Sequence, residues 1–257
     1  MFPPWIVLHV PHDSYEIPEP VRKQFVLGDK ELEAELLCMT DHNTLDLFSA
    51  LSPNERIVRA PVSRLVVDVE RFADDRLEPM TERGMGAIYT VTSNLKPLRR
   101  PLSIQERETL IKNYYRPHHD KLEQVVSAVL ATHNRCLIID CHSFPDIALP
   151  YELVDPSVKR PDICIGADEY HSSKKLSESF ISKFRALGWD VRLNDPFSGA
   201  LVPMSRYRND SRVSAIMLEI NRRLYIDEAS AVPRPDFQNV CGAIKNICAS
   251  AIDACYD

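Results

Sequence analysis

Several short apolar runs along this chain end abruptly on polar residues. The clearest cover residues 5–10, 136–139 and 214–218, and continuous apolar runs of this length are typical of strands buried in a parallel sheet. The residues that follow them are Pro11-His12-Asp13-Ser14, Asp140-Cys141-His142-Ser143 and Glu219-Ile220-Asn221. Because open α/β sheets bind ligands at the carboxyl ends of their strands, we predict that these polar residues meet at one edge of the sheet.

The remaining pattern predicts further strands and helices. Strands are expected at residues 56–60, 64–69, 162–166 and 189–193, with a turn around Pro61. Helices are expected at residues 18–27, 30–51, 103–133, 172–187 and 236–254. In the longest helix, Ser103 and Glu106 form a capping box and Pro117 predicts a kink. Residues 73–101 lack a clear period and predict a long surface excursion, which is more often functional than idle.

This order of elements predicts an α/β fold. Apolar strands that alternate with helices indicate a mostly parallel or mixed central sheet with helices on both faces. No repeat, low-complexity linker or shift in composition divides the chain, so we expect a single domain over residues 1–257.

Composition narrows the classes of function. The net charge of −6 argues against a nucleic-acid partner, because binding phosphates requires an excess of Lys and Arg. No stretch approaches the roughly 18 apolar residues of a membrane span, and the amino terminus lacks the pattern of a signal peptide. The seven cysteines lack Cys-x-x-Cys pairing and most lie in apolar patterns, which indicates buried thiols in a reducing compartment. We expect a cytoplasmic protein with a small-molecule substrate, and the oligomeric state stays open.

His12, His142 and Glu219 together are the side chains of a zinc hydrolase site, two imidazoles and a carboxylate base. A single histidine after a strand is more often a structural residue than a ligand. A glutamate inside an apolar strand is harder to explain structurally, because an unpaired buried carboxylate is costly. The combination favours a metal site, with Glu219 as the general base that moves a proton from the attacking water to the leaving amine.

The best candidate for the third metal ligand is Asp41, and His42 is the alternative. Asp41 interrupts an otherwise apolar stretch of predicted helix, where aspartate has poor propensity. The alternative for Asp41 is a simple helix break or cap, and His42 lies on a different helical face. Asp140 precedes His142 on the same strand face, so it either holds the second nitrogen of an imidazole or caps the strand end. Ser143, next to His142, is likewise expected to support the ligands without binding the metal itself.

Arginines near these strands are candidates for binding a substrate carboxylate. Arg64 and Arg71 flank the predicted strand at residues 64–69, and Arg223 follows shortly after Glu219. A guanidinium group grips a carboxylate in bidentate fashion. The alternative for each arginine is a salt bridge with a nearby acidic residue. The candidate substrate-binding residues are Arg64, Arg71, Asn221 and Arg223.

These residues resemble the motifs of the N-formylglutamate amidohydrolase (N-formylglutamate deformylase) family. The blocks appear in the family's order from residue 5 to about residue 228. The Asp-x-His-Ser and Glu-Ile-Asn-x-Arg-Leu-Tyr blocks are the most specific. The blocks are Pro11-His12 with Ser14 and Pro18, Asp41-x-x-Thr44 with Leu47-Phe48, Ser63-Arg64 with Asp68 and Arg71, Arg116-Pro117-His118-His119, Asp140-x-His142-Ser143 and Glu219-Ile220-Asn221-x-Arg223-Leu224-Tyr225.

The resemblance implies a phosphorylase/hydrolase-like α/β fold related to zinc carboxypeptidases and zinc-dependent muramoyl-alanine amidases. It also implies Zn²⁺ on His12, Asp41 and His142, with Glu219 as the base. The implied reaction is hydrolysis of the formyl amide of N-formyl-L-glutamate, in histidine degradation.

The chain departs from the family pattern in three places. Leu45 stands where an acidic residue is usual, Glu70 stands where Asn is usual, and the Gly-Gly pair expected near Gly199 is incomplete. The alternatives are therefore another N-acyl amino acid, a larger peptide-like substrate of the carboxypeptidase or amidase kind, or a metal-free binding protein of the same fold.

Overall fold

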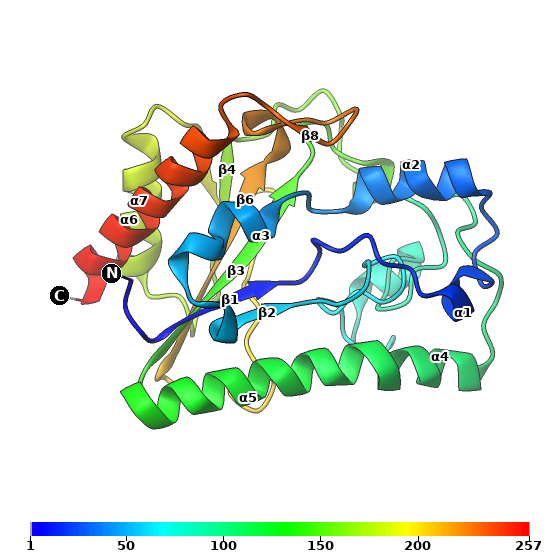
Figure 1. Ribbon diagram of the computed structural model, residues 1–257, viewed down its shortest axis with the longest axis horizontal. Helices are drawn as coiled ribbons and strands as arrows, with labels where there is room; N and C mark the ends of the chain where they lie inside the picture. The colour runs from blue at the N-terminus through cyan, green and yellow to red at the C-terminus, as the bar shows by residue number, and fades with distance from the viewer. Residues whose placement is uncertain (1, 257) are drawn as a thin grey trace.

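A six-stranded sheet crosses the molecule (Figure 1). The computed structural model describes residues 2–256. The strands are arranged in the order β2-β1-β3-β6-β4-β5. Strand β4 runs antiparallel to β6 and the other neighbouring pairs are parallel, which confirms the mostly parallel or mixed sheet of a single α/β domain. The strands are β1 (Ile6–Val10), β2 (Ile57–Arg59), β3 (Cys136–Phe144), β4 (Ile163–Gly166), β5 (Val191–Leu193) and β6 (Val213–Asn221).

Helices cover both faces of this sheet, as expected (Figure 1). Because successive strand residues point to opposite faces, Ile138 and Ile139 belong to different apolar cores. Ile138 packs under α5 (Arg116–His133), which lies along one face. Ile139 packs on the other face, under three helices. These are α3 (Thr44–Phe48), α6 (Lys174–Arg185) and α7 (Phe237–Tyr256).

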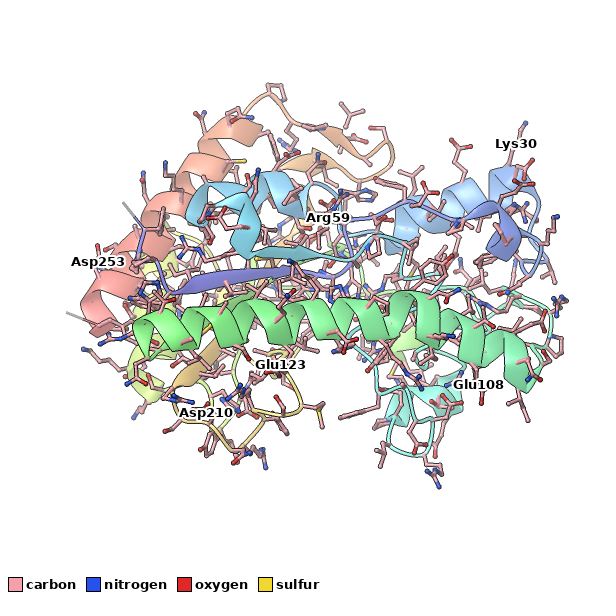
Figure 2. The ribbon with its side chains drawn as sticks, turned by 60° about the horizontal axis from the view of Figure 1, so that its bottom comes forward. Lys30, Arg59, Glu108, Glu123, Asp210 and Asp253 are labelled. Atoms are coloured by element: carbon pink, nitrogen blue, oxygen red, sulfur yellow. The ribbon has the colours of Figure 1, made fainter. Side chains whose placement is uncertain are left out.

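A second group of helices lies beyond the carboxyl ends of the strands, on the right of Figure 1. It comprises α1 (Glu19–Arg22), α2 (Asp29–Met39) and α4 (Ile104–Leu110), which share an apolar core of their own. We call it the second core, to separate it from the apolar layers on the two faces of the sheet. Helix α4 begins with the predicted capping box. It continues into α5 through a π-helical turn at Ile111–Tyr115, and Figure 2 shows the long helix that results. Pro117 lies in the first turn of α5, where proline is tolerated.

Two predicted helices are broken or shortened. The helix expected at residues 30–51 breaks between α2 and α3, where Asn43 adopts a φ of 56°. In the break, the backbone N–H of Asp41 donates to the carbonyl of His12 at 3.0 Å. This bond to another part of the chain takes the place of helical pairing and overrides the local pattern. The helix expected at residues 18–27 is reduced to α1.

Residues 64–69 form buried turns, so the strand predicted there is wrong. Leu65 and Val66 are fully buried, as the apolar pattern requires. However, the N–H of Val66 donates to the carbonyl of Ser63 at 2.8 Å, and the buried Arg99 donates to the carbonyl of Leu65. The second core buries this apolar run as effectively as a sheet does.

Residues 73–101 are only partly a surface excursion. Met85, Tyr89 and Leu98 are almost fully buried in the second core. The more exposed part contains a short 3₁₀ turn at Pro79–Arg83. The weak periodicity therefore comes from irregular backbone that is nevertheless packed.

The other predicted elements are present, with most ends shifted by one or two residues. The structure extends β3 and β6 beyond the apolar runs, so both strands include their polar residues. It also adds a small hairpin of β7 (Ile226–Asp227) and β8 (Val232–Pro233) after β6.

The register of the sheet brings four polar side chains to one face. His142 pairs with Glu219 across β3 and β6, and His9 pairs with Asp140 across β1 and β3. Because Ile138 faces α5, Asp140 and His142 face the same side in the alternation of β3. The site therefore forms on the face that α5 covers, toward the carboxyl ends of the strands.

None of the helices within residues 2–256 is both long enough and apolar enough to cross a membrane. The seven cysteines are free thiols, four buried and three half-buried, which agrees with the expected buried thiols. Cys141 is fully buried, and burial raises the pKa of its thiol. This environment does not favour a nucleophilic role for Cys141.

A close backbone approach explains the glycine at the end of β4. A Cβ atom at Gly166 would lie 2.3 Å from the carbonyl oxygen of Gly199 and 2.3 Å from Cε of Met217, whereas one at Gly242 in α7 would have no atom within 4 Å. Gly166→Ala should lower the free energy of unfolding by about 1–3 kcal/mol through overpacking. Gly242→Ala should raise it by about 1 kcal/mol through helix propensity. Urea denaturation measures both, and equal effects would contradict this explanation.

Candidate metal centre and active site

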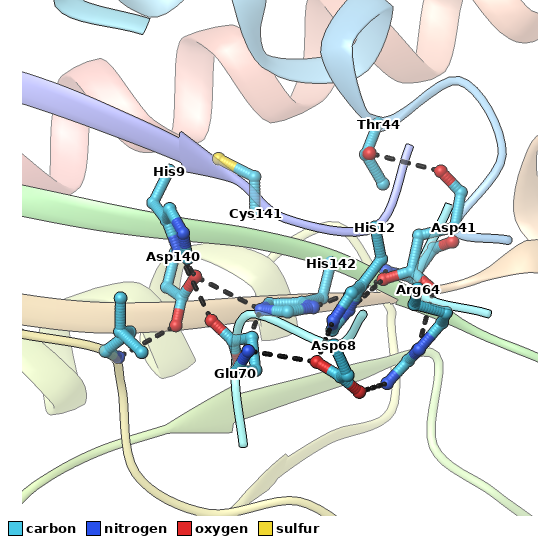
Figure 3. A network of polar contacts seen from close by, with 12 residues as sticks. His9, His12, Asp41, Thr44, Arg64, Asp68, Glu70, Asp140, Cys141 and His142 are labelled. Atoms are coloured by element: carbon cyan, nitrogen blue, oxygen red, sulfur yellow. Dashed lines mark hydrogen bonds and ion pairs between the residues drawn. The ribbon is translucent and has the colours of Figure 1, made fainter. Parts of the chain in front are cut away.

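Three potential metal ligands, His12, Asp41 and His142, converge at the carboxyl ends of β1 and β3 (Figure 3). All three are buried, and their ligand atoms lie within 4.8 Å of one another. Oδ2 of Asp41 is 3.2 Å from Nδ1 of His142 and 3.6 Å from Nδ1 of His12. The structure thus brings together the set that the sequence analysis selected.

The Nε2 atom of each imidazole contacts a carboxylate on the side away from Asp41. Nε2 of His12 lies 2.9 Å from Oδ1 of Asp68, and Nε2 of His142 lies 3.1 Å from Oδ1 of Asp140. Nδ1 of each ring therefore faces Asp41, and Nδ1 of His12 is a buried atom without a hydrogen-bond partner in the described part of the chain. Carboxylate–imidazole pairs of this kind orient metal-binding histidines. This donor set fits Zn²⁺.

Asp41 is held as an ionised carboxylate. Its Oδ1 lies 3.2 Å from Nη2 of Arg222, and the N–H of Ser143 donates to its Oδ2 at 3.3 Å. Burial alone would raise the pKa of Asp41, but its contacts with the two histidines and with Arg64 hold that pKa well below its usual range. A permanently charged carboxylate is a suitable metal ligand.

His42, the alternative third ligand, is turned elsewhere. Its Nε2 donates to the carbonyl of Leu37 at 2.7 Å, and its Nδ1 contacts the hydroxyl of Tyr15. Burial lowers the pKa of His42 to about 4, with a further contribution from the charge of Arg222. Asp41, by contrast, lies in the break between α2 and α3 and also belongs to the ligand group. The helix break and the position of a potential metal ligand, which were considered as alternatives, therefore occur together.

Glu219 lies beside the ligand group, opposite His142 in the sheet. It is 7% exposed, and its Oε2 has no hydrogen-bond partner within residues 2–256. Burial raises the pKa of Glu219 to about 8, against the opposing effect of His142. A carboxylate with such a pKa can accept and release a proton near neutral pH.

A cavity of about 460 Å³ opens over Asp41, His142 and Glu219. A volume of this size suits a small ligand. Its wall includes Met80, so the segment at residues 73–101 contributes to the cavity. It also carries the side chains of four arginines, Arg64, Arg71, Arg83 and Arg222.

Asn221 and Arg223 are not among the described residues that line this cavity. The amide of Asn221 donates to the carbonyl of Pro161 at 2.9 Å and to Oδ1 of Asp146 at 3.1 Å. The guanidinium of Arg223 pairs with Asp146 and, at 2.6 Å, with Asp162. These contacts fix the end of β6.

Comparison with known proteins places this chain in a family. The model of the N-formylglutamate amidohydrolase family matches residues 5–226. The chain belongs to this family. The resemblance expected from the sequence blocks is therefore confirmed, and this family is one of hydrolases that act on the amide bond of a small molecule.

Two solved structures share the fold of this N-formylglutamate amidohydrolase family member. N-formylglutamate amidohydrolase from Ralstonia eutropha JMP134 has a TM-score of 0.83 and 21% sequence identity, over 100% of this chain and 95% of that one. The gene product Atu2144 from Agrobacterium tumefaciens has a TM-score of 0.71 and 18% identity, over 98% of this chain and 92% of that one. No curated protein matches the chain.

Sequence reasoning missed some residues of this candidate site. Asp68 belongs to one of the sequence blocks, yet its contact with Nε2 of His12 was not predicted. Arg222, rather than its neighbour Arg223, reaches Asp41. An aspartate inside an apolar run was an available signal for Asp68, as it was for Asp140. The meeting of His9, Glu70 and His118 next to His142 was not predicted either, although His118 lies in a sequence block and Glu70 was noted as a departure from the family pattern.

Asp68→Asn keeps the shape of the side chain but removes the charge that holds Nε2 of His12. We expect the affinity for Zn²⁺ to fall about 10- to 100-fold, the usual effect of losing such a partner. Competition titration of metal-free protein against a chromophoric chelator measures this affinity. The matched control is Asp74→Asn, which changes a surface carboxylate paired with Arg76 and should have no effect. Unchanged affinity in Asp68→Asn would contradict the orienting role.

Proposed function

We propose that this chain is a zinc-dependent enzyme that hydrolyses N-formyl-L-glutamate to glutamate and formate. The observation that carries the proposal is the meeting of two buried imidazoles with Asp41, next to the unpartnered carboxylate of Glu219. Membership of the N-formylglutamate amidohydrolase family supports the same chemistry.

His12, Asp41 and His142 are proposed as the protein ligands of Zn²⁺. Three protein ligands with one position left open are the usual set of a catalytic zinc. Two imidazoles favour zinc over magnesium and calcium, which prefer oxygen ligands. When bound, zinc polarises the amide carbonyl and makes water more acidic.

Glu219 is proposed as the general base, which then acts as the general acid. Its Oε2 accepts no hydrogen bond from the described residues, so it is free to accept one from water in the cavity. Asp41 stays ionised, whereas the pKa of Glu219 is raised to about 8. Of these two carboxylates, Glu219 is the one that can take the proton of the attacking water and give it to the leaving amine.

The substrate assignment rests on positive charge in the cavity wall. A glutamate-type substrate brings two carboxylates to a site that already holds Asp41 and Glu219. Nε of Arg71 is a buried atom without a hydrogen-bond partner within residues 2–256, and its ion-pair contact with Asp68 is 3.8 Å long. Arg64 is more fully engaged, at 3.0 Å from the same carboxylate. Arg71 is therefore the proposed main partner of a substrate carboxylate, with Arg64 beside it.

The cavity of about 460 Å³ favours a small N-acyl amino acid over a larger peptide-like substrate. Asn221 and Arg223 are proposed to act on the substrate only indirectly, by fixing the end of β6 next to Glu219. A cytoplasmic location and a role in histidine degradation remain predictions from the sequence.

Zinc-loaded protein should release formate from N-formyl-L-glutamate faster than from N-formyl-L-glutamine, because the second carboxylate of the former pairs with an arginine. N-acetyl-L-glutamate and a dipeptide complete the panel and test the acyl group and the substrate size. A chelator should abolish the activity and added zinc should restore it. Full activity without metal, or a preference for the dipeptide, would contradict the proposal.

The same assay identifies the substrate-binding arginine. Arg71→Met should lower kcat/KM for N-formyl-L-glutamate by about 10- to 150-fold, since a charge-assisted hydrogen bond is worth about 1.5–3 kcal/mol. Uncharged N-formyl amides should be affected less, and bound zinc should not change. Arg76→Met, at an exposed arginine paired with Asp74, is the matched control. If Arg71→Met and the parent have equal kcat/KM for both classes of substrate, Arg71 does not bind the substrate and has only a structural role.

Glu219→Gln keeps the shape of the side chain and removes the proton acceptor. Turnover should fall by about 10²–10⁴, the usual contribution of general acid–base catalysis. Zinc measured on the purified variant should stay at the level of the parent. Loss of zinc instead would make Glu219 a ligand and would reassign Asp41.

A further inference from the structure

A second group of potential metal ligands lies behind His142. His9, Glu70 and Asp140 each offer a ligand atom, and these atoms lie within 4.8 Å of one another. Nδ1 of His9 is 2.7 Å from Oδ1 of Asp140 and 3.2 Å from Oε1 of Glu70. Figure 3 shows the ring of His142 between this group and Asp41.

A proton on His9 does not satisfy both carboxylates. Nδ1 of His9 carries at most one hydrogen, yet oxygens of Glu70 and Asp140 both face it. Oε1 of Glu70 is accordingly a buried atom without a hydrogen-bond partner in the described chain. Even with His9 fully protonated, the three groups together carry one net negative charge, and His9 and Asp140 are completely buried. A divalent ion beside neutral His9 makes the group neutral and gives Oε1 a partner.

The surrounding hydrogen bonds orient His9 as a ligand. Its Nε2 lies 2.8 Å from Nε2 of His118 on α5, a distance that requires one hydrogen between the two nitrogens. When Nε2 of His9 carries that hydrogen, its Nδ1 is left for a metal. Oδ2 of Asp140 accepts from the N–H of Leu201 at 2.9 Å, which fixes the second ligand in the same way.

A second cavity, of about 230 Å³, borders part of this group. Glu70 and Asp140 line this cavity together with residues 198–202. Glu70 also lines the first cavity, as do Arg71, Ser198 and Met217. An ion on the carboxylates of Glu70 and Asp140 would border the second cavity, where water can complete its coordination.

We propose that a second divalent transition-metal ion binds Nδ1 of His9 and the carboxylates of Glu70 and Asp140. Imidazole and carboxylate are ligands that Zn²⁺ and related ions share. Oδ1 of Asp140 has two lone pairs, so it can bind the ion and still accept from Nε2 of His142, 3.1 Å away. The ion joins β1 and β3 to the buried turn that carries Glu70. It is a structural ion, which the hydrolysis proposed above does not require.

Counting ions in defined variants tests the site. Metal-free protein is loaded with excess Zn²⁺, desalted and analysed for zinc by mass spectrometry. The parent should hold about two ions per chain, and Glu70→Gln and His9→Gln should each hold about one. His12→Ala should lose the other ion. The matched control is His119→Gln, which replaces an imidazole that contacts the carbonyl of Val69 and belongs to neither group.

Anomalous diffraction at the zinc edge from loaded crystals of the parent locates the ions without any substitution. A peak between His9, Glu70 and Asp140 is expected in addition to the one at the first site. One ion per chain in the parent and in Glu70→Gln alike, with a single peak at the first site, overturns the second site and leaves the proposed function intact. Zinc retained in His12→Ala and lost in Glu70→Gln supports the second site and removes the first.

Discussion

The neutralisation of buried carboxylates is the constraint on which this structure depends. Carboxylates that are largely removed from water need positive partners close by, because an unpaired buried charge is expensive. The acidic groups outnumber the arginines around them, so the imidazoles and, by our proposal, metal ions must supply the remaining positive charge. The acidic residues are Asp41, Asp68, Glu70, Asp140 and Glu219, and the arginines are Arg64, Arg71 and Arg222.

The second core positions arginines that neutralise some of these buried carboxylates. The sheet delivers histidines and carboxylates, but two of the compensating arginines, Arg64 and Arg71, come from the buried turns beyond its edge. Arg99 fixes those turns by donating to the carbonyl of Leu65. The buried turns therefore place two guanidinium groups next to the carboxylates of the sheet. The packing of the second core fixes these positive charges and so helps to keep the carboxylates ionised.

The sequence predicted those parts of the site that local patterns encode. His12, His142 and Glu219 follow or end apolar runs, so strand periodicity alone places them at one edge of the sheet. Asp41 was recognisable because it disrupts a helical pattern. The sheet class and the helices on both faces followed from the alternation of elements.

The remaining parts depend on contacts between distant segments. Asp68 contacts Nε2 of His12 from a segment that was predicted to be a strand. The local sequence does not distinguish an apolar run that is buried in a sheet from one that is buried in turns. Arg222 and Arg223 are adjacent and chemically identical, so only the geometry at the end of β6 decides which one reaches Asp41. The pairing of His9 with His118 joins β1 to α5 and has no signature in either segment.

Glu219, the proposed base, lies on β6, and β6 is the last strand of the sheet to be synthesised. Strands β4 and β5 precede β6 in the chain, yet they join the sheet only through it, because β6 lies between β3 and β4. During synthesis from the amino terminus, the edge of β3 stays unpaired until β6 arrives, and such an edge is open to aggregation. The three proposed zinc ligands are all made before that moment and Glu219 only with it. A nascent or truncated chain therefore contains the proposed ligands without the proposed base, and the candidate site is complete only when the last strand of the sheet is inserted.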